Sequence, residues 1–379
     1  MNLSVSSLLE TAQRRTGLVD WGDRDFQTPL PIYLKACETE ARLSPLGRLI
    51  VRRSAIRLLS NRLFIHAAFK RNRQIHQEQI RRPIFIVGFP RTGTTLLHNL
   101  LAQDPDNRAP LLWELMYPAG PTPYDRDTGL PHTRKRMRLL NGLIPQLRAV
   151  HPMHPEAPNE CTYLFENSFK TLLFSLLYDI PQYGQWLLKQ DLQPAYRYYR
   201  RQLQLLQWQS ARRTWVLKSP SHMMALDSLS AVFPDAQIIQ IHRHPQNSVP
   251  SLASMIAILR QLTSDHVDFP TAGQNAMDIS KLFMERATRF REDNATDKII
   301  DLQYLDLLKE PIGVVRSLYE QIGRPLNSQL EGKLRNWLAN NPQQRYGRHV
   351  YELEHFGLNA GQINTTFKEY IHRFNIRPE

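Results

Sequence analysis

Residues 83–104, PIFIVGFPRTGTTLLHNLLAQD, contain the pattern that decides the fold. Residues 84–87 form a short apolar run rich in β-branched side chains, which is typical of a buried strand. A tight loop with two glycines follows, and from Thr94 the leucines recur at helical spacing until Asp104 and Pro105 end the helix. A strand, a glycine loop and a helix N-terminus in this order predict an anion site, because loop amides and unpaired helix N–H groups face the same point.

Three segments downstream repeat the order of strand and helix. The apolar runs at residues 215–217, 237–242 and 298–302 are typical of strands, and each precedes a segment with helical spacing. Strands that alternate with helices form a parallel sheet covered on both faces. The sequence therefore predicts an α/β fold with a three-layer, P-loop-like parallel sheet flanked by helices, and ligands at the carboxyl ends of the strands.

Helical spacing also predicts structure outside this core. Residues 1–82 are expected to form a helical N-terminal extension packed on the core. Three further helices are predicted, over residues 131–147, 159–178 and 196–210.

Composition limits the kind of protein this is. A chain of 379 residues can bury a large core, and 48 Lys and Arg against 35 Asp and Glu favour a polyanionic partner. Two cysteines imply no disulfide framework and fit a reducing compartment. Because no signal peptide precedes the extension and no apolar run is long enough to cross a bilayer, we expect a soluble, cytoplasmic protein.

The segment 44–82 is strongly basic and helical in pattern, and it allows two interpretations. One is a helix that contacts a membrane surface or nucleic acid. The other is a packed helix whose arginines are solvated or paired with acidic neighbours. The second is favoured, because apolar residues are interleaved at the spacing of a core-facing helix.

The glycine loop matches only the first part of a Walker A motif. Gly88 and Gly93 have the required spacing, but Thr94 stands where that motif has lysine, and Arg91 supplies a cation from inside the loop. No predicted strand ends in an aspartate that would hold Mg²⁺. The loop is therefore expected to hold phosphates without cleaving a triphosphate, which weakens the alternative of a P-loop kinase acting on a small molecule.

Three segments taken together resemble a known family. GFPRTGTTLL (residues 88–97), LKSPSHMMALDSL (217–229) and HRHPQNSVPSLAS (242–254) are similar to the sulfotransferases that use 3′-phosphoadenosine 5′-phosphosulfate (PAPS), in the bacterial-type branch with the loop P-R-[ST]-G-T-T. The resemblance implies transfer of a sulfuryl group to a hydroxyl of a small-molecule, lipid or saccharide acceptor, with 3′-phosphoadenosine 5′-phosphate (PAP) as product and no metal. It implies a sulfotransferase core at 83–325 and a segment, 326–379, that closes the nucleotide site.

The resemblance also assigns roles to individual residues. The family's 3′-phosphate loop corresponds to Arg243 and Ser251, and Lys218 corresponds to the lysine beside the transferring group. A basic C-terminal segment closes over the nucleotide in related enzymes, which makes Arg345 and Arg348 candidates for that contact. The resemblance implies that the 5′-phosphosulfate is bound by the loop residues Arg91, Thr92, Gly93, Thr94 and Thr95.

The general base is expected to be Glu114, which follows the opening helix at the distance where glutamate-using relatives carry theirs. Glu160, His154 and His222 remain alternatives, since a carboxylate or imidazole within hydrogen-bond reach of the acceptor suffices. No metal site is expected, because prolines break up the residues around His154. A non-enzymatic basic module that binds membranes or nucleic acid is a third possibility, although no nucleic-acid partner is expected. Acceptor identity and oligomeric state stay open.

Overall fold

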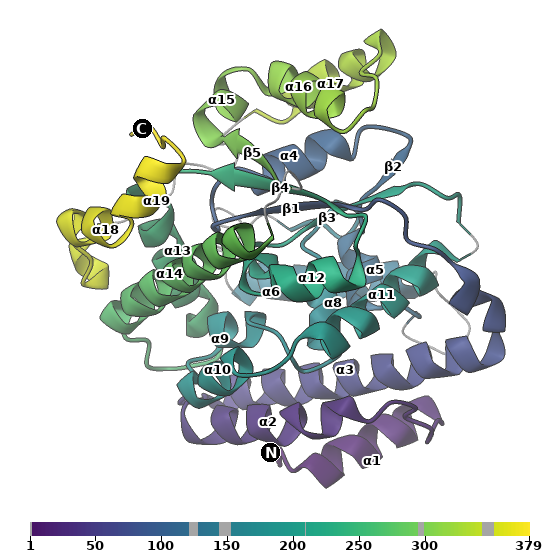
Figure 1. The fold of residues 1–379 in the computed structure, drawn as a ribbon. Coiled ribbons are helices and arrows are strands. Elements are labelled where there is room, and N and C mark those ends of the chain that lie inside the picture. The colour runs from purple at the N-terminus through teal and green to yellow at the C-terminus, as the bar shows by residue number, and fades with distance from the viewer. Residues whose placement is uncertain (1, 121–127, 144–152, 209, 295–298, 343–351) are drawn as a thin grey trace.

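The computed structural model describes residues 2–120, 128–143, 153–208, 210–294, 299–342 and 352–379. Its centre is a five-stranded parallel sheet with strand order β2-β3-β1-β4-β5 (Figure 1). The four predicted strands are confirmed. A two-residue edge strand, β2, was not predicted. The strands are β1 (Ile84–Gly88), β2 (Asn107–Arg108), β3 (Thr214–Lys218), β4 (Gln237–His242) and β5 (Ile299–Gln303).

The two faces of β1 belong to different layers of the core. Phe85 and Val87 pack into one apolar cluster, and Ile84 and Ile86 pack into a second one. Alternating residues of a strand point to opposite faces, so a strand that is apolar throughout requires cover on both sides. The expected three-layer α/β fold follows from this pattern.

Helices on the Ile84 side of the sheet include the one that follows the glycine loop. Leu97, Leu100 and Leu101 of this helix pack against the strands. The helices of this layer are α4 (Thr94–Leu101), α15 (Tyr304–Lys309), α16 (Pro311–Gln321) and α17 (Ser328–Asn340).

The layer on the Phe85 side is thicker. Its helices next to the sheet are α11 (Gln193–Gln207), α12 (Leu226–Val232), α13 (Pro245–Gln261) and α14 (Phe269–Asp293). Shorter helices lie between these and the N-terminal helices, namely α5 (Leu112–Met116), α6 (Gly129–Leu143), α8 (Thr162–Glu166), α9 (Leu173–Leu177) and α10 (Pro181–Leu188).

The prediction of one helix over residues 159–178 is wrong. The segment forms the two short helices α8 and α9, and Phe169 between them has a φ of +58°, which is incompatible with a continuing helix. The ring of Phe169 is fully buried beside Tyr33 and Phe174. Burial of this aromatic ring favours the break, and the apolar pattern alone does not reveal it.

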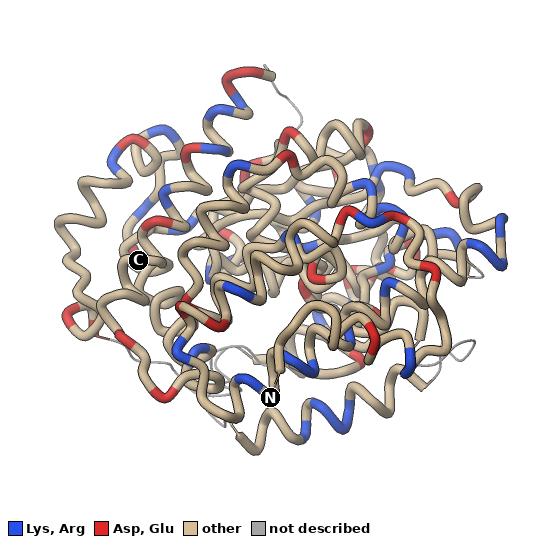
Figure 2. The backbone as a smooth tube through the Cα atoms, turned by 90° about the horizontal axis from the view of Figure 1, so that it is seen from below, with Lys and Arg blue, Asp and Glu red and all other residues tan. Residues whose placement is uncertain are grey.

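The N-terminal helices α1 (Val5–Thr16), α2 (Pro29–Thr39) and α3 (Pro45–Arg71) form an outer layer (Figure 1). Arg57 and Arg62 of α3 are buried, with Arg57 Nη2 2.8 Å from Glu166 Oε2 and Arg62 Nη1 donating to Asn167 O at 2.8 Å. Seen from this side, basic and acidic positions are intermixed (Figure 2). These contacts support the interpretation of the basic stretch as a packed helix.

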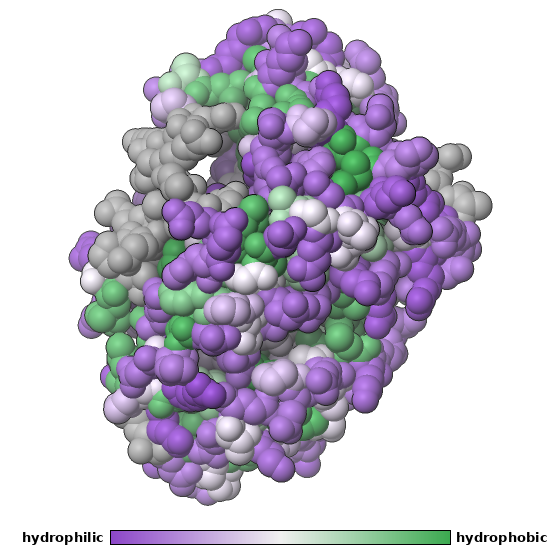
Figure 3. All heavy atoms as spheres, turned by 90° about the vertical axis from the view of Figure 1, so that its left-hand side faces the viewer, coloured by the Kyte–Doolittle hydropathy of each residue, from purple (hydrophilic) through white to green (hydrophobic). Residues whose placement is uncertain are grey.

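Of the last helices, α18 (Ala360–Thr366) packs against α13, and α19 (Lys368–Arg373) packs beside the end of β4. The OH of Tyr370 lies 2.9 Å from Nδ1 of His242, and Phe374 stacks on the same imidazole with ring centroids 4.1 Å apart. The described residues on this side of the molecule are largely hydrophilic, with smaller apolar patches between them (Figure 3). Among the described residues, no helix has the length and apolar character needed to cross a membrane.

Candidate active site

The glycine loop owes its shape to two positions that exclude a side chain. Gly88 has a φ of +147°, and a Cβ there would lie 2.7 Å from Ile241 O. Gly93 has a φ of +85° at the N-cap of α4, and its Cβ would lie 2.9 Å from the ring of Tyr304. Thr92 is buried and its hydroxyl donates to Phe89 O at 2.8 Å. The backbone between β1 and α4 is therefore fixed before a ligand arrives.

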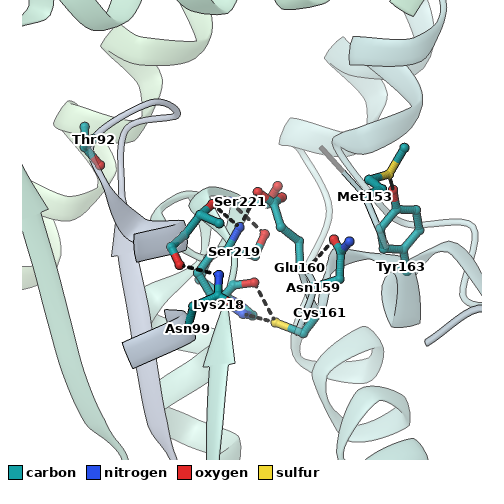
Figure 4. Close-up of polar contacts among 12 residues, drawn as sticks. Thr92, Asn99, Met153, Asn159, Glu160, Cys161, Tyr163, Lys218, Ser219 and Ser221 are labelled. Atoms are coloured by element: carbon teal, nitrogen blue, oxygen red, sulfur yellow. Dashed lines mark hydrogen bonds and ion pairs between the residues drawn. The ribbon is translucent and has the colours of Figure 1, made fainter. Parts of the chain in front are cut away.

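Lys218 lies at the carboxyl end of β3, next to this loop. Its side chain is 2% exposed, and Nζ donates to Oγ1 of Thr95 at 3.3 Å and to Oε1 of Glu160 at 2.7 Å (Figure 4). The register that pairs Ile86 with Lys218 places this cation at the same edge of the sheet as the glycine loop. A buried lysine thus joins the predicted phosphate loop to a carboxylate.

Glu160 is held in this position by its neighbours. The amide of Cys161 donates to Lys218 O at 3.0 Å, and Oδ1 of Asn159 accepts from the amide of Glu160 at 2.7 Å. The carboxylate itself is partly open to solvent, with 23% of the side chain exposed. A carboxylate on a fixed backbone, beside a cation and reachable from outside, has the features of a general base.

Glu114 occupies a different environment. Its Oε1 lies 2.8 Å from Nη2 of Arg108, and Oε2 accepts from the amide of Leu111 at 3.0 Å, which caps α5. The guanidinium of Arg108 in turn lies 4.5 Å from the ring centroid of Trp215. Both oxygens of Glu114 thus have structural partners. Its role as base stays a prediction, and the geometry favours Glu160.

The two histidine alternatives have little support. Burial lowers the pKa of His222 to about 3, and its ring nitrogens contact the OH of Tyr196 at 2.8 Å and Sγ of Cys161 at 3.2 Å. His154 is exposed, and its Nδ1 accepts from the amide of Glu156 at 3.2 Å. His222 is therefore part of the core, and His154 is part of a surface loop.

Arg91, Arg243 and Ser251 meet at the carboxyl end of β4. Nε of Arg91 donates to Oγ of Ser251 at 3.1 Å, and Nη1 of Arg243 donates to the carbonyl of Arg91. The structure thus brings together the groups predicted for the two phosphates. Arg345 and Arg348 lie outside the described residues.

Two contacts of Arg243 were missed by sequence reasoning. Its guanidinium lies 4.3 Å from the ring centroid of Tyr304, and it forms a two-pronged ion pair with Glu379, Nε to Oε1 at 2.6 Å and Nη2 to Oε2 at 2.7 Å. Tyr304 directly follows β5, and its place at a strand end was a usable signal. Nothing in the sequence indicated that Glu379 returns to this edge. Within the described part of the chain, no three His, Cys, Asp or Glu side chains cluster as metal ligands.

Comparison with known proteins agrees with this geometry. Residues 83–328 match the family described as "Sulfotransferase family". The omega-hydroxy-beta-dihydromenaquinone-9 sulfotransferase Stf3 of Mycobacterium bovis is 29% identical over 292 residues, which cover 72% of this chain and 70% of the relative.

Two solved structures are similar along nearly their whole length. Sulfotransferase STF9 of Mycobacterium avium is 28% identical with a TM-score of 0.90, and the match covers 100% of this chain and 98% of that one. Sulfotransferase STF1 of Mycobacterium tuberculosis is 31% identical with a TM-score of 0.81, covering 97% of this chain and 98% of that one. The chain belongs to the sulfotransferase family and is an enzyme that transfers a sulfuryl group.

Proposed function

We propose that this enzyme moves the sulfuryl group of PAPS to the hydroxyl of an acceptor. The observation that carries the proposal is the position of Lys218, a buried cation that contacts both the phosphate loop and Glu160. A preorganised cation at the point where charge develops is commonly the largest catalytic contribution.

The donor would lie along the carboxyl ends of β1, β3 and β4. The loop from Arg91 to Thr95 and the N-terminus of α4 suit the 5′-phosphosulfate, since amides, hydroxyls and a guanidinium converge there. Arg243 and Ser251 suit the 3′-phosphate, because a guanidinium forks onto two phosphate oxygens. The contact between Arg91 and Ser251 supports placing both phosphates on one continuous surface.

The reaction is an in-line displacement at sulfur. The acceptor oxygen forms a bond to sulfur while its proton passes to the carboxylate of Glu160. The bond between sulfur and the bridging phosphate oxygen breaks, and PAP departs with the added negative charge on its 5′-phosphate. Lys218 and Arg91 stabilise that charge.

An apolar cluster beside Glu160 supports an acceptor with apolar character. Figure 4 shows Met153 and Tyr163 next to the segment that carries Glu160. The relative Stf3 is named for an omega-hydroxylated dihydromenaquinone, an apolar alcohol. The cluster consists of Leu112, Met116, Met137, Tyr117, Leu140, Met153 and Tyr163.

Calorimetric titration with PAP tests the proposal directly. We expect stoichiometric binding in the presence of EDTA, and preference for PAP over ATP with Mg²⁺. The variant Arg243→Ala is expected to lose most of this affinity. If Arg243→Ala bound PAP with unchanged affinity, Arg243 would not bind the 3′-phosphate. An absolute requirement of sulfuryl transfer for Mg²⁺ would contradict the mechanism.

A further inference from the structure

The outer side of α6 combines basic and large apolar residues. Over Gly129–Leu143 the helix has no acidic side chain. Four large apolar side chains are exposed in the described part of the chain, and two belong to α6, Leu139 at 60% and Leu143 at 47%. Beside them, Arg134, Lys135 and Arg138 are exposed.

The spacing along α6 sorts these residues into lines. Lys135, Leu139 and Leu143 are four residues apart and lie along one side of the helix, and Arg134 and Arg138 form the neighbouring line. The opposite side faces the protein. The exposed leucines therefore lie outside the side that the protein covers, and α6 presents apolar side chains on both its inner and its outer side.

The inner side of α6 is firmly seated. Gly129 is buried against Trp113, where a Cβ would lie 3.0 Å from Cε3 of the indole. Thr133 is buried and its hydroxyl donates to Gly129 O at 2.9 Å, and Met137 is 6% exposed. Since this side is already packed, rotating the helix to bury Leu139 and Leu143 would expose an apolar core cluster.

The inner side also connects the surface to the site. Met137 and Leu140 belong to the apolar cluster that contains Met153 and Tyr163. Glu160 precedes Tyr163 by three residues, and its carboxylate contacts Lys218. One helix therefore contributes to the outer surface and to the apolar cluster beside the proposed base.

We propose that the outer face of α6, defined by Arg134, Lys135, Arg138, Leu139 and Leu143, docks on an anionic lipid bilayer and that the acceptor is an alcohol taken from that bilayer. Leucines enter the boundary between headgroups and acyl chains, while lysine and arginine stems extend to the lipid phosphates. Charge complementarity selects this occupant, because the charged side chains of α6 are all basic. Arg134 is ion-paired with the exposed carboxylate of Glu156 at 2.6 Å, so the attraction rests mainly on Lys135 and Arg138. The part about the acceptor rests on the proposed function.

Vesicle co-sedimentation tests the docking. The full chain is mixed with vesicles of phosphatidylcholine alone, or of phosphatidylcholine with phosphatidylglycerol. We expect binding to the anionic vesicles only. One basic residue near an anionic surface changes affinity roughly fivefold, so Lys135→Glu combined with Arg138→Glu should weaken binding by about 30-fold or more. Leu139→Ser with Leu143→Ser should weaken it as well.

Two surface changes on α3 serve as matched controls. Arg53→Glu reverses an exposed charge, and Leu46→Ser removes a side chain that is 41% exposed. Both should leave vesicle binding nearly unchanged. Equal loss in Arg53→Glu and in the α6 charge variant would overturn the proposal, because the effect would then follow total charge. Equal binding to both kinds of vesicle would overturn it too.

PAP titration of each variant separates this inference from the proposed function. The α6 variants should bind PAP as the unmodified chain does, which also shows that they fold. A chain that binds PAP but no anionic vesicles contradicts only the docking, whereas a chain that binds vesicles but not PAP contradicts the proposed function. The unmodified chain could instead form a dimer that the double variant Leu139→Ser with Leu143→Ser cannot form. That result would show that the face binds a second copy of the chain, and it would overturn docking on a bilayer.

Discussion

The ion pair between Lys218 and Glu160 has one buried end and one accessible end. Lys218 is 2% exposed, and a buried ammonium without an anion is costly. Glu160 supplies that anion while the donor is absent. Oxygens of the phosphosulfate can replace it, and the carboxylate is then available for the acceptor proton. The same contact would thus stabilise the empty site and prepare the base.

Exchange of Glu160 for glutamine should separate the two candidate bases. Glu160→Gln keeps the size of the side chain but removes the proton acceptor, so kcat should fall about 100-fold to 10,000-fold, with PAP affinity nearly retained. Sulfuryl transfer kinetics and PAP calorimetry measure the two effects.

Glu114→Gln is the matched comparison. Removal of the buried partner of Arg108 should cost about 3–5 kcal/mol of unfolding free energy and leave kcat nearly unchanged in the folded fraction. If Glu114→Gln abolished turnover without loss of stability while Glu160→Gln stayed active, the base would be Glu114.

Lys218→Ala should also slow sulfuryl transfer. Loss of the cation removes stabilisation of the leaving phosphate, and losses of 100-fold to 1,000-fold are typical when one such group is removed. Lys218→Arg keeps the charge but not the shape, so partial recovery would show that charge matters there. Single-turnover transfer rates with saturating donor report the chemical step, and an unaltered rate in Lys218→Ala would exclude a catalytic role.

At the scale of elements, α4 is attached to the sheet through a buried histidine. Nε2 of His98 lies 3.1 Å from Val216 O in β3. Burial, together with the charge of Lys218, lowers the pKa of His98 to about 3. Burial has the same effect on His222. Both imidazoles are therefore neutral in the folded state near neutral pH.

Acid should destabilise the fold through these two groups. An unfolded histidine takes up a proton below a pKa of about 6.5, whereas the folded protein holds His98 and His222 neutral down to about 3. The contribution is therefore fully present above the unfolded value and is lost as pH falls between these limits. From about pH 7.5 to about pH 5.5 each histidine should cost about 1.4 kcal/mol.

Chemical denaturation at the two pH values measures this loss. His98→Gln retains a group that can donate to Val216 O, and this group does not titrate. The variant should therefore lose about 1.4 kcal/mol less unfolding free energy between the two pH values than the unmodified chain does. An unchanged dependence in that variant would show that His98 is not responsible.

Strand positions were predictable from the sequence because β1, β3, β4 and β5 are apolar runs with turn residues at their ends. The two-residue strand β2 was not predictable from the sequence, because so short a strand shows no alternation of apolar and polar residues. The break at Phe169 depends on aromatic neighbours distant in sequence. The loop was predictable because a strand, two glycines and a helix N-terminus follow one another in the sequence. Lys218, Arg243 and Ser251 were assigned through the resemblance to the sulfotransferases that use PAPS. To choose between Glu114 and Glu160 one must know the hydrogen-bond and ion-pair partners of each carboxylate in the folded protein, and no sequence pattern reveals these partners.

At the scale of the whole molecule, the N-terminal layer is joined to the core by a buried ion pair. Arg57 and Glu166 are each 6% exposed, and Arg57 also donates to Met116 O at 3.2 Å. Met116 belongs to the apolar cluster beside the proposed base. The N-terminal extension therefore contacts residues that pack next to the site, and it should not unfold independently of the core.

Arg57→Ala should accordingly destabilise the entire chain. It leaves Glu166 buried without its cation, which costs about 3–5 kcal/mol. Arg53 lies one turn earlier and is exposed, so Arg53→Ala should change stability by less than about 0.5 kcal/mol. Thermal unfolding followed by circular dichroism should show one transition in each case. A separate early transition in Arg57→Ala would mean that the extension melts independently.

If Arg243 binds the 3′-phosphate as proposed, its pairing with Glu379 gives the donor an internal competitor. The phosphate would then have to displace a carboxylate that already accepts from Nε and Nη2 of the guanidinium. The measured dissociation constant is then the intrinsic one divided by the fraction of molecules in which Glu379 has moved away. Glu379→Gln should tighten PAP binding in calorimetry and leave the rate of sulfuryl transfer at saturation unchanged. Product release would gain from the same competition, because the returning carboxylate takes the place that PAP leaves.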